Sequence, residues 1–523
     1  MNFSKHSLIA LLALCLILFY NFYFFELIYF ALLDAPYLWL KLALIGLFAF
    51  ALLGGALELL TFLGRGAWIR IVIILVFAIS ASFFYSINAL HIGVTPDLIS
   101  SIVEANPREI NETLNLSFIF SVLIAFGFPV FGLILIQIKK LLFLKAIFHN
   151  ILAVFVYLAM ILVLWFGFIG KDLTFIFKQN PNLYYVFNPI SPIRSSIQYL
   201  KQQSQKDLSY TQVALDAKLV PSIRPKIIVF VLGESARGAN FSLNGYGKET
   251  NPYTAREHSL ISFKNFSSCG VITAISVPCM MTDYTQKSYE RNLSKFRDNL
   301  LDITQRLGID TFYIGNNGGG CIGDICVRLP KENVKFYNDG NLDGVMLEDL
   351  NQILAKARGN TFIVLHQMGS HGQNYSARYP KEFRRFKPTC EGAEIQNCSL
   401  ESLENSYDNS LLYTDYFLYA SIQSLQKMQE HFDVALWYIS DHGESLGENG
   451  IYMHGGLPYF LSPKTQTQVP SIIWLGRGFE WVYRRMKPKE YQELSQDYVF
   501  HTLLRLWGIE TEVYEAGLDL THS

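Results

Sequence analysis

Residues 227–235 read Ile-Ile-Val-Phe-Val-Leu-Gly-Glu-Ser, a continuous apolar run that ends in a carboxylate. Short runs of this kind are typical of strands buried on both faces of a sheet, and here helical patterns separate them. The sequence therefore predicts an α/β domain over residues 225–523, with a mostly parallel sheet flanked by helices. Four further strands are expected at 311–314, 361–365, 434–439 and 469–475.

Polar side chains follow these strands, at the edge where open α/β sheets bind their ligands. Each one alone could cap the helix that follows, but capping and packing do not explain the whole set. Carboxylate oxygen and imidazole nitrogen are ligands that zinc favours, and two strand ends supply three of them. The candidate residues are Glu234, His366, His371, Asp441 and His442, of which Glu234, Asp441 and His442 form the predicted zinc site.

The segment from Cys269 to Cys279 offers two hydroxyl groups, those of Thr273 and Ser276. A disulfide across this segment would hold a hydroxyl in place, and coordination to a divalent metal would lower its pKa enough to make it a nucleophile. The alternative is an ordinary Ser/Thr loop that is cross-linked for stability.

Seven Cys are present, and the six beyond residue 260 fall into three close pairs. Their spacing does not match a zinc finger, and their clustering favours local disulfides in an oxidising compartment. The remaining Cys15 lies in an apolar stretch. The expected disulfides are Cys269–Cys279, Cys321–Cys326 and Cys390–Cys398.

The first 170 residues hold most of the apolar surplus of this 523-residue chain, which is 51% hydrophobic. A helix of about 20 apolar residues can cross a bilayer. Five stretches qualify, at 7–25, 42–63, 71–90, 116–138 and 151–169. The alternative for the first is a signal peptide, but no small-residue cleavage site follows it. We therefore expect a transmembrane domain of five helices over residues 1–170 and a connector with an amphipathic helix over 171–224.

Lys and Arg concentrate before the first stretch and in the loops after the second and fourth. The positive-inside rule then places the N-terminus in the cytoplasm and everything beyond residue 170 on the far side, which in a bacterium is the periplasm. Thr95-Pro96 predicts a short helix near 95–106 in a loop on that same side. The formal net charge of −1 shows no basic excess, so nucleic acid is not an expected partner.

Four motifs resemble those of the bacterial phosphoethanolamine transferases that modify lipid A. That family includes the mobile colistin-resistance enzymes and belongs to the alkaline phosphatase and sulfatase superfamily. The resemblance covers nearly the whole chain. The motifs are Gly233–Tyr246 with Asn251-Pro252, the Thr273 segment with its Cys pair, His366–Gly372 with Arg378-Tyr-Pro380, and Ser440–Gly447 with His454-Gly455 and Pro458-Tyr459.

The resemblance implies that Thr273 is the nucleophile and the fourth ligand of one zinc ion. It also implies that His371 and His454 bind substrate phosphate, transfer protons or hold a second zinc, and that His366 contacts substrate or supports its strand end.

The chain departs from the family pattern in two places. Many relatives have Lys where Ile322 stands, directly after the first Cys of the middle pair. In the loop before the fourth stretch, the Asn, Thr and Glu of the relatives correspond to Ser101, Ala105 and Glu109. Only Glu109 is therefore carried over as a donor contact.

The implied reaction is a ping-pong transfer of phosphoethanolamine from phosphatidylethanolamine to lipid A through a covalent threonine intermediate. It would reduce the attraction of the envelope for cationic peptides such as polymyxin. The enzyme is expected to be a monomer in the bacterial inner membrane.

Core sugar, a periplasmic glycan or a flagellar protein are alternative acceptors. A phosphoglycerol transferase would generally lack the three Cys pairs. A sulfatase would need a Cys/Ser-x-Pro-x-Arg motif, which is absent around Thr273. A catalytically inactive binding protein is disfavoured because all four expected zinc ligands are present.

Overall fold

The computed structural model describes residues 2–64, 66–105, 110, 113–139, 142–204, 209–318, 320–337 and 340–522. The chain divides into two compact units. The helical unit comprises Met1–Ile99 and Leu114–Lys201, and the α/β unit comprises Ser100–Thr113 and Gln202–Ser523. The domain boundaries expected from the sequence divide the chain into residues 1–170, 171–224 and 225–523, and they remain predictions.

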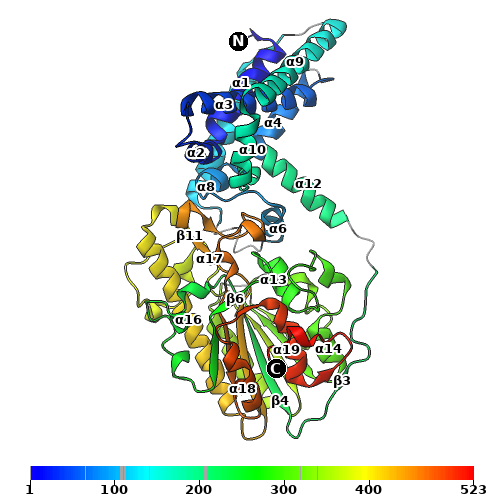
Figure 1. Ribbon diagram of the computed structural model, residues 1–523, viewed down its shortest axis with the longest axis vertical. Coiled ribbons are helices and arrows are strands. Elements are labelled where there is room, and N and C mark those ends of the chain that lie inside the picture. Colours follow the sequence, from blue (N-terminus) through cyan, green and yellow to red (C-terminus); the bar gives the residue numbers. More distant parts are fainter. Residues whose placement is uncertain are drawn as a thin grey trace. The chain divides into compact units, whose positions relative to one another are not determined.

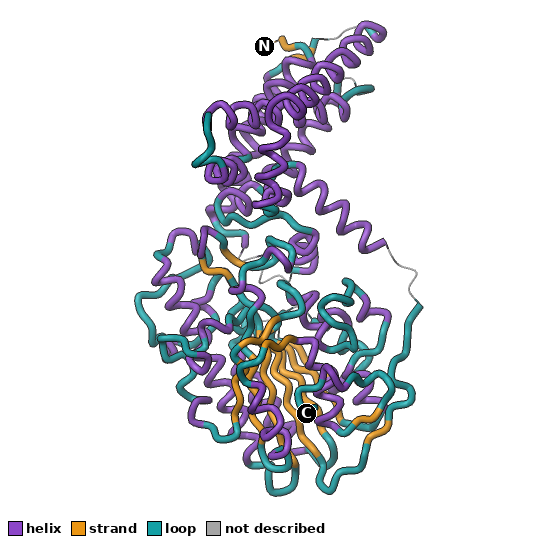
Figure 2. The backbone as a smooth tube through the Cα atoms, viewed as in Figure 1, coloured by secondary structure: helices purple, strands orange, loops and turns teal. Residues whose placement is uncertain are grey.

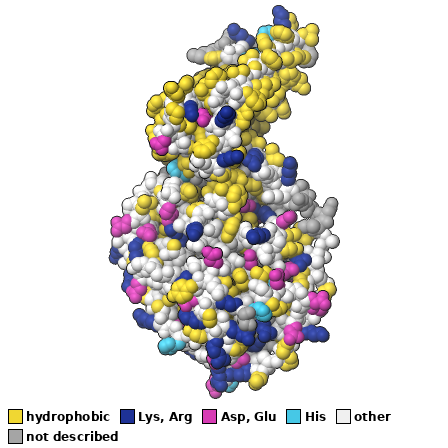
Figure 3. Space-filling model, in the orientation of Figure 1, with side chains coloured by type: hydrophobic (Ala, Val, Ile, Leu, Met, Phe, Trp, Pro, Cys, Tyr) yellow, Lys and Arg dark blue, Asp and Glu magenta, His cyan; other side chains and the backbone are white. Residues whose placement is uncertain are grey.

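The helical unit consists of apolar helices whose outward side chains are mostly hydrophobic (Figure 3). Its helices are α1 (Lys5–Tyr20), α2 (Phe22–Ala31), α3 (Leu38–Leu60), α4 (Ala67–Ser82), α5 (Phe84–Asn88), α8 (Leu116–Leu135), α9 (Phe143–Leu164), α10 (Gly170–Gln179), α11 (Leu183–Val186) and α12 (Ile190–Ser204). A π-helical turn, Trp165–Ile169, joins α9 to α10, and the short strands β1 (Asn2–Phe3) and β2 (Gln137–Ile138) pair in parallel. Helix α6 (Pro96–Glu104) lies where Thr95-Pro96 predicts a helix start.

Among the described residues, three helical segments are long and apolar enough to cross a membrane, at 38–60, 116–135 and 144–179. Helices α1 and α2 make a fourth span if they count as one, but they are bent by 69°. The bend falls at the buried Asn21, whose side chain donates to the carbonyls of Leu16 and Asn188 at 3.0 and 2.8 Å. Helix α4 has only 16 residues. The expected number of five spans is therefore not confirmed.

A buried ionic cluster ties α1 to α3 within the helical unit. The fully buried Glu58 lies 3.3 Å from Lys5 Nζ and 2.7 Å from His6 Nδ1. Lys5 also donates to Asn150 Oδ1 at 3.1 Å, which adds α9 to the cluster. The one charge in the stretch 42–63 is thus compensated by side chains of another helix, as buried charges need to be.

The α/β unit is built around a seven-stranded sheet (Figures 1 and 2). Five neighbouring strands run parallel, which confirms the mostly parallel sheet expected from the sequence. The strand expected at 469–475 is antiparallel to both of its neighbours, so its carboxyl end lies at the opposite edge. The order is β5 (Leu260–Phe263), β13 (Ser471–Leu475), β10 (Asp433–Ser440), β4 (Lys226–Gly233), β9 (Thr361–His366), β7 (Asp310–Gly315) and β8 (Val334–Phe336).

Helices cover both faces of this sheet, because each central strand is apolar on both sides. Helices α14 (Leu300–Arg306), α18 (Glu480–Met486) and α19 (Val499–Trp507) share one core with Ile228, Phe230 and Leu232 of β4. Helices α15 (Met346–Lys356) and α16 (Leu400–Gln426) pack on the other face (Figure 1).

Smaller elements complete the unit. They are α13 (Thr273–Met280), α17 (Lys464–Thr467), and the strand pairs β3 (Lys218–Leu219) with β15 (Ile509–Glu510), β6 (Asn265–Ser267) with β14 (Glu493–Ser495), and β11 (Ser445–Leu446) with β12 (Tyr452–Met453). The three disulfides are Cys269–Cys279, Cys321–Cys326 and Cys390–Cys398, the local pairing expected from the sequence, and Cys15 is free.

Candidate active site

Two neighbouring parallel strands bring three metal-ligand side chains together. Glu234 follows β4, and Asp441 and His442 follow β10, its neighbour in the sheet. One ligand atom from each lies within 4.8 Å of the other two, and all three residues are fully buried. His442 Nε2 lies 3.4 Å from Glu234 Oε1 and 3.3 Å from Asp441 Oδ2. The parallel pairing of β4 with β10 is what places these residues side by side.

Backbone and hydroxyl groups orient the two carboxylates. Asp441 Oδ1 accepts hydrogen bonds from the backbone N–H groups of Ser235 and His442, at 3.1 and 2.7 Å. The Ser235 hydroxyl donates to Glu234 Oε1 at 2.7 Å. Asp441 Oδ2 is buried and makes no hydrogen bond within the described residues, so it is open toward the ligand cluster.

Burial raises the pKa of Asp441 to about 7, because a carboxylate loses its hydration inside the protein. A divalent cation among the three side chains would counter that effect and stabilise both carboxylates in their ionised form. The donor set of two carboxylates and one imidazole, with a buried oxygen still open, therefore fits zinc.

Thr273 is the first residue of α13, and its hydroxyl points at this cluster. Thr273 Oγ1 lies 3.0 Å from Glu234 Oε2 and 3.4 Å from His442 Nε2. The N-terminus of a helix also favours negative charge nearby. The other hydroxyl of the segment, Ser276, is fully buried and accepts a hydrogen bond from the Gly270 N–H at 2.9 Å. Ser276 thus orders the loop, whereas Thr273 lies beside the predicted ligands.

Three further histidines lie close to the ligand cluster. The ring of His454 is centred 4.0 Å from that of His442 and 6.0 Å from that of His371. Burial lowers the pKa of His371 and of His454 to about 3, so both imidazoles are neutral near pH 7 and able to accept a proton or bind a metal. The structure therefore brings His371 and His454 together beside the cluster.

His366 is 1% exposed, and its ring is held by partners of its own. Its Nδ1 contacts the Tyr313 hydroxyl at 2.8 Å and its Nε2 contacts Asn317 Nδ2 at 3.0 Å. Asn317 in turn donates to Glu234 Oε2 at 2.7 Å. This geometry favours a supporting role for His366 over a contact with substrate. Glu109, the expected donor contact, lies outside the described residues.

Sequence reasoning assigned no role to two residues that the structure places in the site. Asn317 holds Glu234, and its only signal in the sequence is its position two residues after β7. Glu444 lies fully buried with Oε1 3.1 Å from His454 Nδ1, and burial raises the pKa of Glu444 to about 8. Its signal is the Asp-His-Gly-Glu run that follows β10.

A groove of about 240 Å³ opens next to the nucleophile segment, within the α/β unit. Ala274, the neighbour of Thr273, and Ile322 both line it. Its charged lining consists of two carboxylates, Glu104 and Asp324, and two cations, Arg291 and Lys295. Glu104 lies 3.4 Å from the guanidinium of Arg291, so the groove presents charges of both signs.

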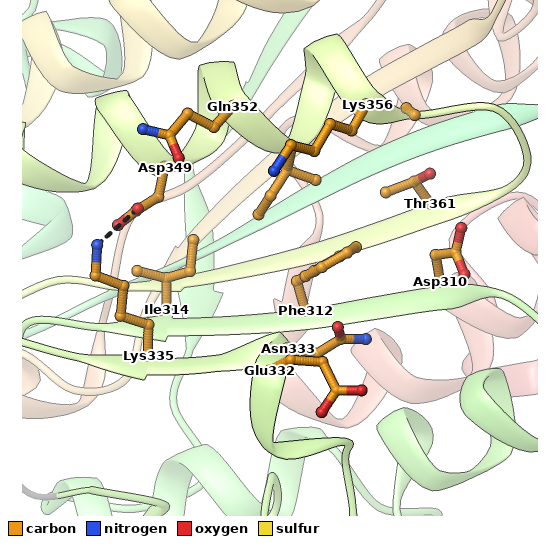
Figure 4. Close-up of a pocket in the computed structure, with 12 residues that line it drawn as sticks. Asp310, Phe312, Ile314, Glu332, Asn333, Lys335, Asp349, Gln352, Lys356 and Thr361 are labelled. Atoms are coloured by element: carbon orange, nitrogen blue, oxygen red, sulfur yellow. Dashed lines mark hydrogen bonds and ion pairs between the residues drawn. The ribbon is translucent and has the colours of Figure 1, made fainter.

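A second groove, also of about 240 Å³, lies between α15 and the outer strands β7 and β8 (Figure 4). An ion pair of 2.8 Å between Lys335 and Asp349 crosses it. None of the predicted site residues lines this groove.

Known proteins resemble this chain over most of its length. The profile of the sulfatase family matches residues 226–509, and that of "Phosphoethanolamine transferase EptA/EptB" matches residues 48–204. The chain is 36% identical to phosphoethanolamine transferase EptA of Escherichia coli over 90% of this chain and 88% of that protein. It is 32% identical to phosphatidylethanolamine transferase Mcr-1 of Escherichia coli over 89% of this chain and 88% of that protein.

A solved structure also matches the whole chain. The integral membrane lipooligosaccharide phosphoethanolamine transferase A (EptA) of Neisseria meningitidis superposes with a TM-score of 0.91 and 27% identity, over 99% of this chain and 98% of that one. An N-terminal helical membrane region and a C-terminal sulfatase-like domain are thus common to both proteins. The chain therefore belongs to the lipid A phosphoethanolamine transferase family of the alkaline phosphatase and sulfatase superfamily, and it is a phosphoethanolamine transferase.

Proposed function

We propose that this enzyme transfers phosphoethanolamine from phosphatidylethanolamine to lipid A, with Thr273 as the nucleophile. The observation that carries the proposal is the position of Thr273 Oγ1, 3.0 Å from Glu234 and 3.4 Å from His442, at the start of a helix. The names of the relatives support the transferred group and its donor, and the name of the Neisseria meningitidis structure, a lipooligosaccharide phosphoethanolamine transferase, supports the acceptor class.

Glu234, Asp441 and His442 would hold one zinc ion, with Thr273 as the fourth ligand. Zinc, when bound, would lower the pKa of the Thr273 hydroxyl and neutralise negative charge on the phosphoryl oxygens. A second zinc could lie near His371 and His454, which are neutral and close together.

The residues of the chain then carry out two displacements. Thr273 Oγ passes its proton to a neighbouring imidazole, His371 or His454, and attacks phosphorus of the donor. A new P–O bond forms, the P–O bond to diacylglycerol breaks, and the imidazolium gives that proton to the departing diacylglycerol oxygen. A protonated phosphate oxygen of lipid A next passes its proton to the imidazole and attacks the same phosphorus. The bond to Thr273 breaks and the imidazolium returns the proton to Thr273 Oγ, which completes a ping-pong cycle.

The groove beside Ala274 would hold the ethanolamine headgroup. Its carboxylates, Glu104 and Asp324, suit an ammonium group, and its cations, Arg291 and Lys295, suit a phosphate. The donor would therefore be held through both its ammonium group and its phosphate.

The product changes the charge of the envelope surface. An added ethanolamine brings a cationic amine to an anionic phosphate, which weakens attraction of cationic peptides and would confer polymyxin resistance. The proposal places the chain in the bacterial inner membrane as a monomer, with the N-terminus in the cytoplasm and residues 225–523 as a catalytic domain in the periplasm.

The test uses the full chain in vesicles that contain phosphatidylethanolamine labelled in its ethanolamine, with lipid A added. Label should reach lipid A, and mass spectrometry should find phosphoethanolamine on Thr273 when lipid A is omitted. Thr273→Ala should lose both signals. Thr282→Ala, which removes a buried hydroxyl just after the same helix, is the matched control and should keep them.

Normal modification of lipid A by Thr273→Ala would overturn the nucleophile assignment. Label transferred from phosphatidylglycerol instead would identify a phosphoglycerol transferase. Label that reaches a core sugar, glycan or flagellar protein but not lipid A would overturn the acceptor alone.

A further inference from the structure

The short helix α10 follows the last long apolar helix of the helical unit, across the π-helical turn Trp165–Ile169. It is amphipathic. Leu173 and Ile176 are buried, whereas Lys171, Phe175 and Lys178 are exposed on the opposite face. Spacings of four and seven residues place these three side chains on one stripe of the helix.

The charged side chains of α10 differ in whether they have a partner of opposite charge. Its single acid, Asp172, pairs with Lys41 at 2.9 Å. Lys171 and Lys178 have no hydrogen bond or ion pair among the residues that the structure describes. Two exposed cations therefore stand on one face without a protein partner, about 10 Å apart along a helix that rises 1.5 Å per residue.

An apolar groove of about 500 Å³ lies between the two lysines. Phe166 and Phe175 border it with exposed fractions of 80% and 59%. Gly170 also lines the groove, and a Cβ there would lie 2.4 Å from the carbonyl oxygen of Trp165. The glycine thus permits the tight π-helical turn that sets these aromatic rings beside the lysines.

This combination of groups suits the headgroup region of a membrane. Aromatic side chains gather there, and basic pockets at that depth bind lipid phosphates. Within the described part of the chain, no apolar helix long enough to cross a membrane follows residue 179. The lysines and the catalytic domain therefore face the same side, where the positive-inside rule expects few cations.

We propose that Lys171 and Lys178, with the groove between them, bind the phosphates of the lipid acceptor before transfer. The proposal rests on the proposed function, and it names where lipid A docks. A lipid with two separated phosphates can engage both lysines at once. Phosphatidylethanolamine has one phosphate and an ammonium group that the lysines would repel, so charge favours the acceptor over the donor.

The test compares the full-length double variant Lys171→Gln/Lys178→Gln with the native enzyme in vesicles. The control is Lys139→Gln/Lys145→Gln, which removes two exposed cations, one that follows α8 and one in the first turn of α9. The apparent KM for lipid A should rise roughly 30-fold in the first variant only, because each lysine near an anionic lipid contributes about fivefold. Release of diacylglycerol from phosphatidylethanolamine without acceptor should stay at the native rate.

A second arm measures binding without turnover. In the Thr273→Ala background, native mass spectrometry should count fewer lipid A adducts after the lysine substitutions, while phosphatidylglycerol adducts stay equal. An unchanged KM together with unchanged adducts would overturn the proposal, as would an equal fall in the donor half-reaction. Equal loss of lipid A and phosphatidylglycerol would reveal a general anionic-lipid site instead. If native enzyme moves no label to lipid A, the proposed function fails, and the adduct counts still decide whether this site binds it.

Discussion

Replacing Glu444 by Ala tests whether the neighbouring carboxylate positions His454. Glu444 is fully buried and its Oε1 lies 3.1 Å from His454 Nδ1. With Nδ1 held in this way, Nε2 is the ring nitrogen left to act on substrate, so Glu444 fixes both the tautomer and the orientation of the ring. Losing the contact should leave His454 free to turn within the site.

The expected loss follows from the energy of that contact. A buried group that loses its hydrogen-bond partner costs about 1–3 kcal/mol, and each 1.4 kcal/mol is about tenfold in rate. Partners that orient a functional histidine change activity by about 10–100-fold. We therefore expect Glu444→Ala to lower kcat by about 10–100-fold with little change in KM for phosphatidylethanolamine.

The assay follows transfer of labelled ethanolamine phosphate to lipid A by purified full-length enzyme, with thermal unfolding measured on the same samples. Glu444→Gln keeps an oxygen that accepts from Nδ1, so it should retain most of the activity. Glu448→Ala is the matched control, because Glu448 lies in the same segment but pairs with Arg237 at 2.5 Å. Wild-type kcat in a stably folded Glu444→Ala would refute the reasoning.

Three other perturbations have distinct outcomes. A chelator should abolish transfer and added zinc should restore it, with about one tightly bound zinc per chain by elemental analysis. Glu58→Ala should destabilise the helical unit by about 3–5 kcal/mol in a detergent unfolding assay, because it leaves Lys5 buried without its counter-charge. Burial raises the pKa of Asp415 from its ordinary value of 3.8 to about 6, so the folded state binds more protons between these values. Stability should therefore fall as pH rises from 4 to 6, by about 3 kcal/mol, and Asp415→Asn should flatten that slope.

Each of these has an outcome that contradicts it. Full activity of metal-free protein would exclude the zinc site. The control Glu26→Ala loses no buried ion pair. A Glu58→Ala variant as stable as this control would show that the ionic cluster around Glu58 contributes nothing to stability. An unchanged pH slope in Asp415→Asn would show that another group titrates in this range.

The membrane part shows what local pattern can and cannot predict. Apolar stretches are visible in the sequence because a bilayer demands about 20 apolar residues in a row. The break at Asn21 was not predicted, and one partner of the Asn21 side chain, Asn188, is 167 residues away in the sequence. The partner of Glu58 was hidden for the same reason.

In the candidate active site, too, some features could be predicted from the sequence and others could not. Residues 227–279 and 434–454 predicted the types of metal ligand, the threonine, and the order of the strands along the chain. The ligands could be predicted because packing alone seldom explains a buried strand that ends in acids and histidines. The roles of Asn317 and Glu444 could not, because each depends on which strand ends are neighbours.

By itself, the sequence determined an apolar helical region, an α/β domain, and the chemistry of the ligands at its strand ends. These properties follow from composition and periodicity, which act over a few residues. Only the tertiary structure decided that β4 pairs with β10, that the Thr273 hydroxyl lies 3.0 Å from Glu234, and that Lys171 and Lys178 share one exposed face. Strand order and helix packing are set by burial summed over the whole chain, so they are not encoded in any short stretch.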